Sequence, residues 1–243
     1  MRVSFQNDLD WLVRQTDEAL MIARAAVEQT VEAIVERDAE LADRIIAGDD
    51  RLDAVYQSIQ TEMLGIIARQ APVAGDLRLL TGLGYMAIHV ERMGDGCVNV
   101  AKLVKLAGPY VYPTDLPARL ATMGKDLIAM IDQASRAFHD RDVPSALDLV
   151  RMDDAIDEGN RRVFKTAVGP NLPPEIREWA GYMLLIGRAI ERIGDHVVDL
   201  GEQIAFIVTG EFHEFTDASH EDSLEKLQAR FGESADAARP RSA

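Results

Sequence analysis

Apolar side chains recur every three or four residues along most of the first 210 positions of the chain. This spacing is typical of amphipathic helices, whose apolar stripe faces a core. Residues 5–37 carry it without Gly or Pro, so they predict one long helix. A second helix is predicted over residues 38–71, where Pro72 ends it, and a third between residues 74 and 108. We expect the second helix to continue through Gly48 at a cost of about 1 kcal/mol.

The second half of the chain repeats this order. Helices are predicted from Thr114 or Asp115 to 139, over 142–169, and from Pro173-Pro174 to 209. The sequence therefore predicts an all-α fold of two tandem three-helix bundles, over residues 1–110 and 111–210, followed by a polar, loosely held tail over 211–243. Because Gly169-Pro170 ends the fifth helix early, we expect the turn of the second hairpin to be off-centre.

Paired carboxylates are the most specific feature of the repeat. Each pair is spaced i, i+4, so both members lie on one helix face. In an antiparallel hairpin the pairs of neighbouring helices face each other, with Pro72 and Pro174 at the two midpoints. The chain thus predicts a box of four carboxylates, built twice. Its members are Asp49, Asp53, Glu91 and Asp95 in the first half and Asp153, Asp157, Glu191 and Asp195 in the second.

Four facing carboxylates repel one another unless a positive group lies among them, and a metal ion is the simplest such group. An all-oxygen ligand set suits iron(III), manganese or magnesium, and zinc is also possible. The alternative is a solvated acidic face, or ion pairs with Arg92, Arg192 or other basic residues. An enzymatic di-iron centre is disfavoured, because none of the five histidines follows a Glu by three residues. His196 follows Asp195 directly and is expected beside the box rather than in it.

Composition narrows the classes of partner. A formal charge of -15 disfavours nucleic acid and anionic lipid as partners. No apolar run approaches the roughly 20 residues of a membrane span, and the first ten residues do not resemble a signal peptide. We therefore expect a cytoplasmic protein without membrane insertion. The single cysteine, Cys97, excludes an intrachain disulfide and is interpreted as a small filler residue on a helix rather than a reactive thiol.

Three stretches resemble the PhoU family of phosphate-signalling regulators. They are QAPVAGDLR at 70–78, HVERMGDGCVNVAK at 89–102 and AIERIGDH at 189–196. The resemblance covers roughly residues 5–210, and it implies two similar three-helix bundles. It also implies a cytoplasmic repressor of phosphate-starvation genes that links the phosphate-specific ABC transporter to the phosphate sensor histidine kinase. Multinuclear clusters, of iron or zinc by resemblance, are implied on the eight carboxylates. Asn99, aligned with Asp199, and the shorter second turn are departures that bear on the equivalence of the two clusters.

The sequence is compatible with three functions. The first is a non-enzymatic adaptor, which we expect to be a homodimer, carrying structural or regulatory metal clusters. The second is a metal-dependent enzyme, which needs an open coordination position and a substrate cavity. The third is a metal-free interaction bundle. Elemental analysis separates the third from the others, and substrate turnover separates the second.

Overall fold

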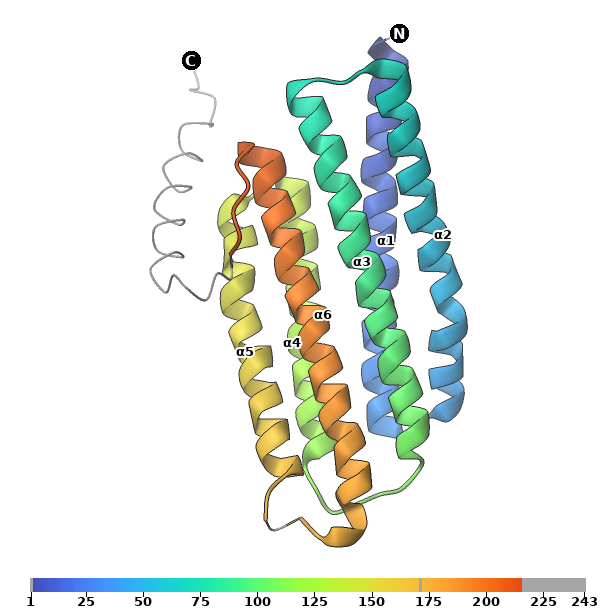
Figure 1. Cartoon of the computed structure of the whole chain (residues 1–243), viewed down its shortest axis with the longest axis vertical. Helices are drawn as coiled ribbons and strands as arrows, with labels where there is room; N and C mark the ends of the chain where they lie inside the picture. The colour runs from blue at the N-terminus through green and yellow to red at the C-terminus, as the bar shows by residue number, and fades with distance from the viewer. Residues whose placement is uncertain (1, 171, 216–243) are drawn as a thin grey trace.

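The structure, a computed structural model, describes residues 2–170 and 172–215 and is drawn in Figure 1. This described part contains six long helices and no β-strand, which confirms the predicted all-α fold. None of these helices is long and apolar enough to cross a membrane. The helices are α1 (Arg2–Glu36), α2 (Ala39–Gln70), α3 (Ala74–Ala107), α4 (Leu116–Asp140), α5 (Val143–Ala167) and α6 (Arg177–Thr209), with a 3₁₀ turn (Pro174–Ile176) before α6.

Two aspartates begin helices as N-caps. An Asp38 carboxylate oxygen accepts hydrogen bonds from the backbone N–H of Glu40 and Leu41, at 2.8 and 2.9 Å. Asp142 accepts one from the N–H of Ser145 at 3.4 Å. Each bond satisfies a backbone donor that the first turn of a helix leaves unpaired. As expected, α2 continues through Gly48 without a break.

The two hairpin turns differ in length, and the second is the longer one, so the expectation of a shorter second turn is wrong. Residues 71–73, centred on Pro72, join α2 to α3, as the carboxylate spacing predicted. In the second half α5 ends at Ala167, and α6 begins only at Arg177. The prolines at 170, 173 and 174 lack the N–H that a helix interior needs, so they place this longer connection before the calculated midpoint. The off-centre second turn is therefore confirmed.

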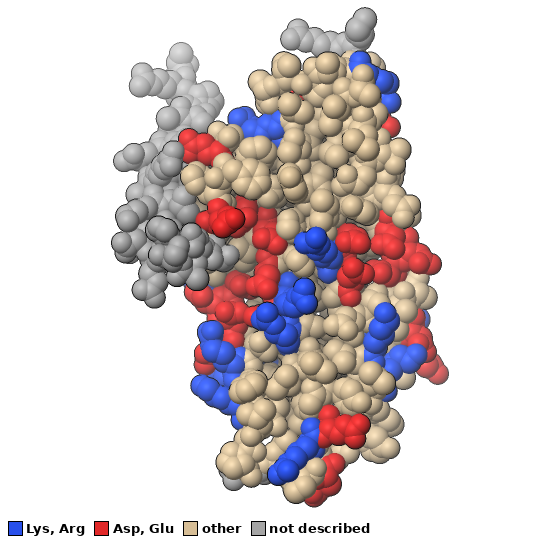
Figure 2. Space-filling model, in the orientation of Figure 1, with Lys and Arg blue, Asp and Glu red and all other residues tan. Residues whose placement is uncertain are grey.

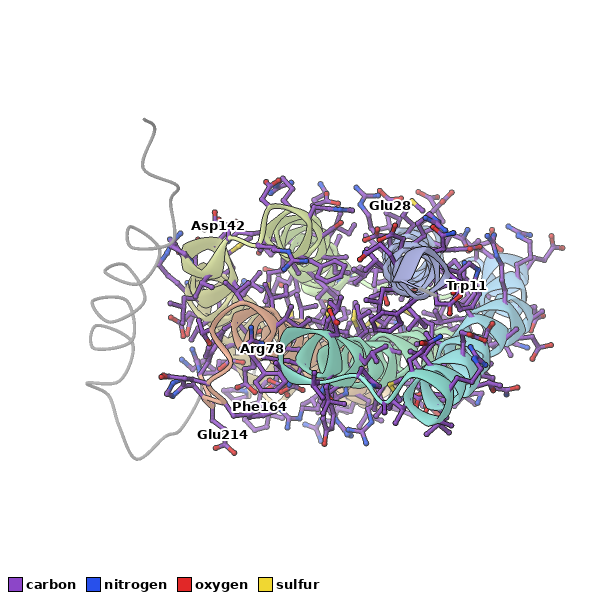
Figure 3. All side chains as sticks on the ribbon, turned by 90° about the horizontal axis from the view of Figure 1, so that it is seen from above. Trp11, Glu28, Arg78, Asp142, Phe164 and Glu214 are labelled. Carbon is purple, nitrogen blue, oxygen red and sulfur yellow. The ribbon has the colours of Figure 1, made fainter. Side chains whose placement is uncertain are left out.

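The two three-helix units pack side by side. Helices α3 and α6 run antiparallel and form the most extensive contact between elements, and α1 packs against α4 (Figure 1). Arg24 on α1 donates two hydrogen bonds to Asp132 on α4, at 2.5 and 3.1 Å. Seen from above, the ribbons show α3 and α6 next to each other at the middle of the assembly (Figure 3). One apolar core runs through both units without interruption.

Glycines on α3 allow this close packing. A Cβ at Gly96 would lie 2.5 Å from Cγ1 of Ile193 on α6, and one at Gly84 would lie 2.7 Å from the sulfur of Met63 on α2. Larger residues at these positions would push the neighbouring helices apart.

The first residues of the predicted tail pack on the bundle. Phe215 is only 3% exposed, and its backbone N–H donates to a carboxylate oxygen of Glu202 at 2.8 Å. The ring of Phe212 lies against Phe206, with centroids 4.8 Å apart, and edge-on to Tyr85. The rest of the predicted tail, residues 216–243, lies outside the described residues.

Candidate metal centres

The structure brings the eight predicted carboxylates into two clusters. The first quartet (Asp49, Asp53, Glu91, Asp95) lies between α2 and α3, and the second quartet (Asp153, Asp157, Glu191, Asp195) lies between α5 and α6. In each quartet the first aspartate feels the negative charge of carboxylates on its own helix and on the facing helix. The two hairpins therefore align as their spacing predicted. Acidic side chains also gather at mid-height on the face shown in Figure 2, with Lys and Arg between them.

A glycine opens each quartet to the facing helix. A Cβ at Gly94 would lie 2.8 Å from Oδ1 of Asp49, and a Cβ at Gly194 would lie 2.5 Å from Oδ1 of Asp153. Both distances are shorter than van der Waals contact, so the aspartate lies where any larger side chain would stand. The glycine in the repeated Glu-Arg-x-Gly-Asp motif thus lets the carboxylate of the facing helix approach the backbone.

Burial and like charge both disfavour ionisation within the quartets. Burial, with added repulsion from Asp157, Asp195 and Glu191, raises the pKa of Asp153 to about 7. The same two causes raise the pKa of Asp49 to about 6. Burial also raises the pKa of Glu91, Glu191 and Asp195 above their usual values. A bound cation would reverse this effect, because it favours the ionised carboxylates.

The second quartet carries basic partners that the first lacks. Arg188 forms an ion pair with Glu191, and Arg161 Nη1 lies 3.6 Å from Asp157 Oδ2. The repeat places Ile88 and Gln57 at the equivalent positions of the first half. Within residues 2–170 and 172–215, the carboxylates of the first quartet form no ion pair within 4.0 Å. The two clusters are therefore chemically unequal, although their carboxylates match.

Arg92 and Arg192 do not neutralise the quartets by direct contact. In the described part of the chain neither guanidinium lies within 4.0 Å of a carboxylate, and both side chains are exposed. Instead they line a cavity of about 340 Å³ between α3 and α6, together with Asp95 and His196. The expected ion pairs with basic residues therefore form in the second quartet, with Arg188 and Arg161 in place of Arg192.

The carboxylate oxygens of the quartets are ligand atoms of the kind that hard cations prefer. Oδ1 of Asp153 is buried and has no hydrogen-bond donor. A buried carboxylate oxygen without a partner is costly, and a metal ion would satisfy it. In neither quartet do three ligand atoms lie within 4.8 Å of one another. Two carboxylate charges at about 4 Å repel by about 4 kcal/mol at an effective dielectric constant of 20, which favours such separation.

One group of metal-ligand type was not recognised in the sequence. Among the described residues, only His89, His196 and Asp199 bring three such ligand atoms to within 4.8 Å of one another. His196 lies beside the second quartet, as expected, but its partner is Asp199. The i, i+3 spacing of these two residues was the available signal. His89 is 110 residues away from Asp199 in the sequence, and only the packing of α3 on α6 brings it close.

Cys97 is buried and free, and burial raises the pKa of its thiol to about 12. A thiol that stays protonated is a poor nucleophile and a poor metal ligand. The interpretation of Cys97 as core filler is confirmed.

Comparison with known proteins now identifies the family. A family model described as the PhoU domain matches residues 16–104 and 120–204, one match in each three-helix unit. The chain belongs to the PhoU family. Its two PhoU domains carry one quartet each, and the seam between α3 and α6 joins them.

Several relatives and solved structures are similar to this PhoU-family chain. The phosphate-specific transport system accessory protein PhoU homolog 1 of Mycobacterium tuberculosis is 30% identical over 217 residues, covering 86% of this chain and 95% of that protein. A PhoU homolog of Caulobacter vibrioides is 27% identical over 209 residues, covering 86% and 91%. The crystal structure of PhoU from Pseudomonas aeruginosa superposes with a TM-score of 0.80 at 25% identity, covering 85% of this chain and all of that one. The regulatory protein PhoU from Streptococcus pneumoniae, at 23% identity and the same TM-score, shares the fold.

Proposed function

We propose that this protein regulates phosphate uptake and phosphate-starvation signalling as a non-enzymatic adaptor. Its partners would be the phosphate-specific ABC transporter and the phosphate sensor histidine kinase, on the cytoplasmic side of the membrane. The observation that carries the proposal is the doubled PhoU-domain match, because it covers both three-helix units in order. The relatives named accessory proteins of the phosphate-specific transport system support the link to phosphate.

The surface supports binding to proteins. The helices α1, α2, α3 and α6 have 32–35 residues and are about 50 Å long, so they offer separate patches along their axes. The end of the bundle where α2 ends and α3 begins shows few charged side chains, whereas acidic side chains gather at mid-height on the face shown (Figure 2). The exposed apolar residues at that end include Leu64, Val73, Leu77, Tyr85 and Phe212. Tyr85 and Phe212 touch each other edge-on. Exposed apolar side chains at one end and acidic side chains at mid-height would suit a protein that meets two partners or a second copy of itself.

We further propose that each quartet holds a multinuclear metal cluster, of iron or zinc by family resemblance, with manganese or magnesium as alternatives. Bound cations would offset the charge of the carboxylates. Each quartet draws two carboxylates from each helix of a hairpin, so cations bound there would link the two helices. Metal binding would therefore stiffen α2 against α3 and α5 against α6, and so regulate the surface that the partners meet.

Deletion and complementation test the regulatory role. A strain lacking the protein should express phosphate-starvation genes in phosphate-replete medium, and the intact gene should restore repression. Purified protein should bind the cytoplasmic portion of the kinase or of the transporter without consuming a substrate. Normal repression in the deletion strain, combined with binding to neither partner, would refute the adaptor role and leave the fold and the family assignment intact.

A further inference from the structure

The group formed by His89, His196 and Asp199 lies on the seam between the two PhoU domains, where α3 of the first hairpin packs on α6 of the second. His89 is on α3, whereas His196 and Asp199 are one turn apart on α6. Nδ1 of His89 lies 3.0 Å from Oδ2 of Asp199, and Nδ1 of His196 lies 3.2 Å from the same oxygen. The two imidazole centroids are 5.6 Å apart and tilted by 46°. Three potential metal-ligand atoms from two helices therefore lie within 4.8 Å of one another.

These distances suit a small divalent cation. Zinc binds imidazole nitrogen and carboxylate oxygen at about 2.0–2.2 Å, so two ligand atoms in a tetrahedral site lie about 3.3 Å apart. The two nitrogen-to-oxygen distances come within a few tenths of an ångström of that edge. Two imidazoles and one carboxylate form a ligand set of catalytic and regulatory zinc sites, and they differ in chemistry from the all-oxygen quartets.

The hydrogen bonding of His89 leaves its Nδ1 available to a ligand. This nitrogen is buried and forms no hydrogen bond, although Oδ2 of Asp199 lies close to it. The His89 and His196 side chains are only 15% and 17% exposed. A buried imidazole nitrogen that forms no hydrogen bond is unfavourable. A cation shared with Asp199 and His196 would give it a ligand bond instead.

The internal repeat shows that the group is not needed for the fold. The equivalents of His89, His196 and Asp199 in the other half are Ala189, Gly96 and Asn99. None of these is an ionisable ligand, and all three line the cavity of about 340 Å³ between α3 and α6. The seam thus packs without this triad at its repeat-related position, and only one of the two positions carries the donors.

We propose that His89, His196 and Asp199 bind one divalent cation of the zinc class, and that this ion ties α3 of the first domain to α6 of the second. The site shares no ligand with the quartets, and the proposal does not rest on the adaptor role. With three protein ligands it leaves one coordination position for water or for a ligand atom of another molecule.

The test uses the full chain, stripped of metal with a chelator and titrated with Zn²⁺. In side-chain ¹H–¹⁵N spectra, the first equivalent of Zn²⁺ should shift the ring signals of His89 and His196. The signals of His139 should shift only when more zinc is added. Zinc affinity is then measured by equilibrium dialysis in H89Q, H196Q and D199N. Each substitution should weaken that one equivalent by about 100-fold or more, since even second-shell changes cost 10- to 100-fold. Circular dichroism confirms that each variant is folded.

Two controls separate this site from the quartets. H139Q removes a histidine of α4 that lies 3.2 Å from Asp17 on α1. Because His139 is not one of the three proposed ligands, this variant should bind the first equivalent of zinc as tightly as the parent. A D49N/D153N variant weakens both quartets and should keep the His89 and His196 response. If the two rings do not move with the first equivalent of zinc, or if folded D199N binds zinc as the parent does, the triad is only a hydrogen-bonded bridge and the proposal is wrong.

Discussion

The buried carboxyl of Asp153 should make the metal-free protein less stable as the pH rises. Its pKa is about 7 in the folded chain and 3.8 as the ordinary value, chiefly because of burial. Between these values the folded state binds the proton and the unfolded state does not. Stability therefore falls as pH rises through this window. A shift of about 3 units corresponds to about 4 kcal/mol, at 1.36 kcal/mol per unit. This cost is almost absent near pH 4 and fully present above pH 7.

The substitution D153N removes the ionisable group and keeps its size. The difference in unfolding free energy between variant and parent should therefore shift by about 4 kcal/mol in favour of the variant from pH 4 to pH 8. Comparing the two proteins at each pH cancels the titration of distant carboxylates. The measurement is urea denaturation followed by circular dichroism, with a chelator present throughout.

The matched control is D154N, which removes the same charge from the exposed neighbouring residue. It reports the effect of net charge alone. If the difference between D153N and its parent is the same at pH 4 and pH 8, to within about 1 kcal/mol, the carboxyl is not destabilised by burial and the reasoning is refuted. Metal at 100 times the Kd should narrow the difference at pH 8, because the parent gains about 2.7 kcal/mol and the variant, which has lost ligand atoms, gains less.

Three further predictions concern other parts of the molecule. The double substitution E191Q/D195N should remove the metal bound at the second quartet and keep the metal bound at the first, as measured by elemental analysis. Full metal content in this variant would contradict the cluster assignment. G201A should destabilise the protein by about 1–3 kcal/mol, because a Cβ there would lie 2.8 Å from a backbone carbonyl of α5. G181A, with nothing within 4 Å, should instead stabilise by up to about 1 kcal/mol in the same urea titration. Cys97 should react with a thiol reagent only on unfolding, since it is buried with a pKa of about 12, and rapid reaction of the native protein would argue against its burial.

The hairpins and their carboxylates could be predicted because they depend on short-range regularities. The helical period places residues i and i+4 on one face, and Pro72 cannot continue a helix. Together these rules align Asp49 with Asp95 across the first turn. The second hairpin follows the same rule despite its longer connection, because the repeated glycine lets Asp153 approach α6 as Asp49 approaches α3.

The surroundings of individual side chains could not be predicted from the sequence in the same way. Helical spacing puts Arg188 one turn before Glu191 and Arg161 one turn after Asp157, but rotamers decide whether they pair. The pKa of Asp153 depends on how completely the neighbouring helices exclude water, which no spacing rule gives. The inequality of the two quartets is therefore a finding of the structure.

The sequence by itself determined the six helices, their turns and the two sets of facing carboxylates, because each follows from periodicity and from residues that begin or end helices. Only the tertiary structure decided that α3 packs antiparallel to α6, that Phe215 returns to the core, and that His89 meets His196 and Asp199. The physical reason is that a helix exposes several faces of comparable hydrophobicity. Which face meets which neighbour is decided by the packing of the whole core, and not by any local pattern.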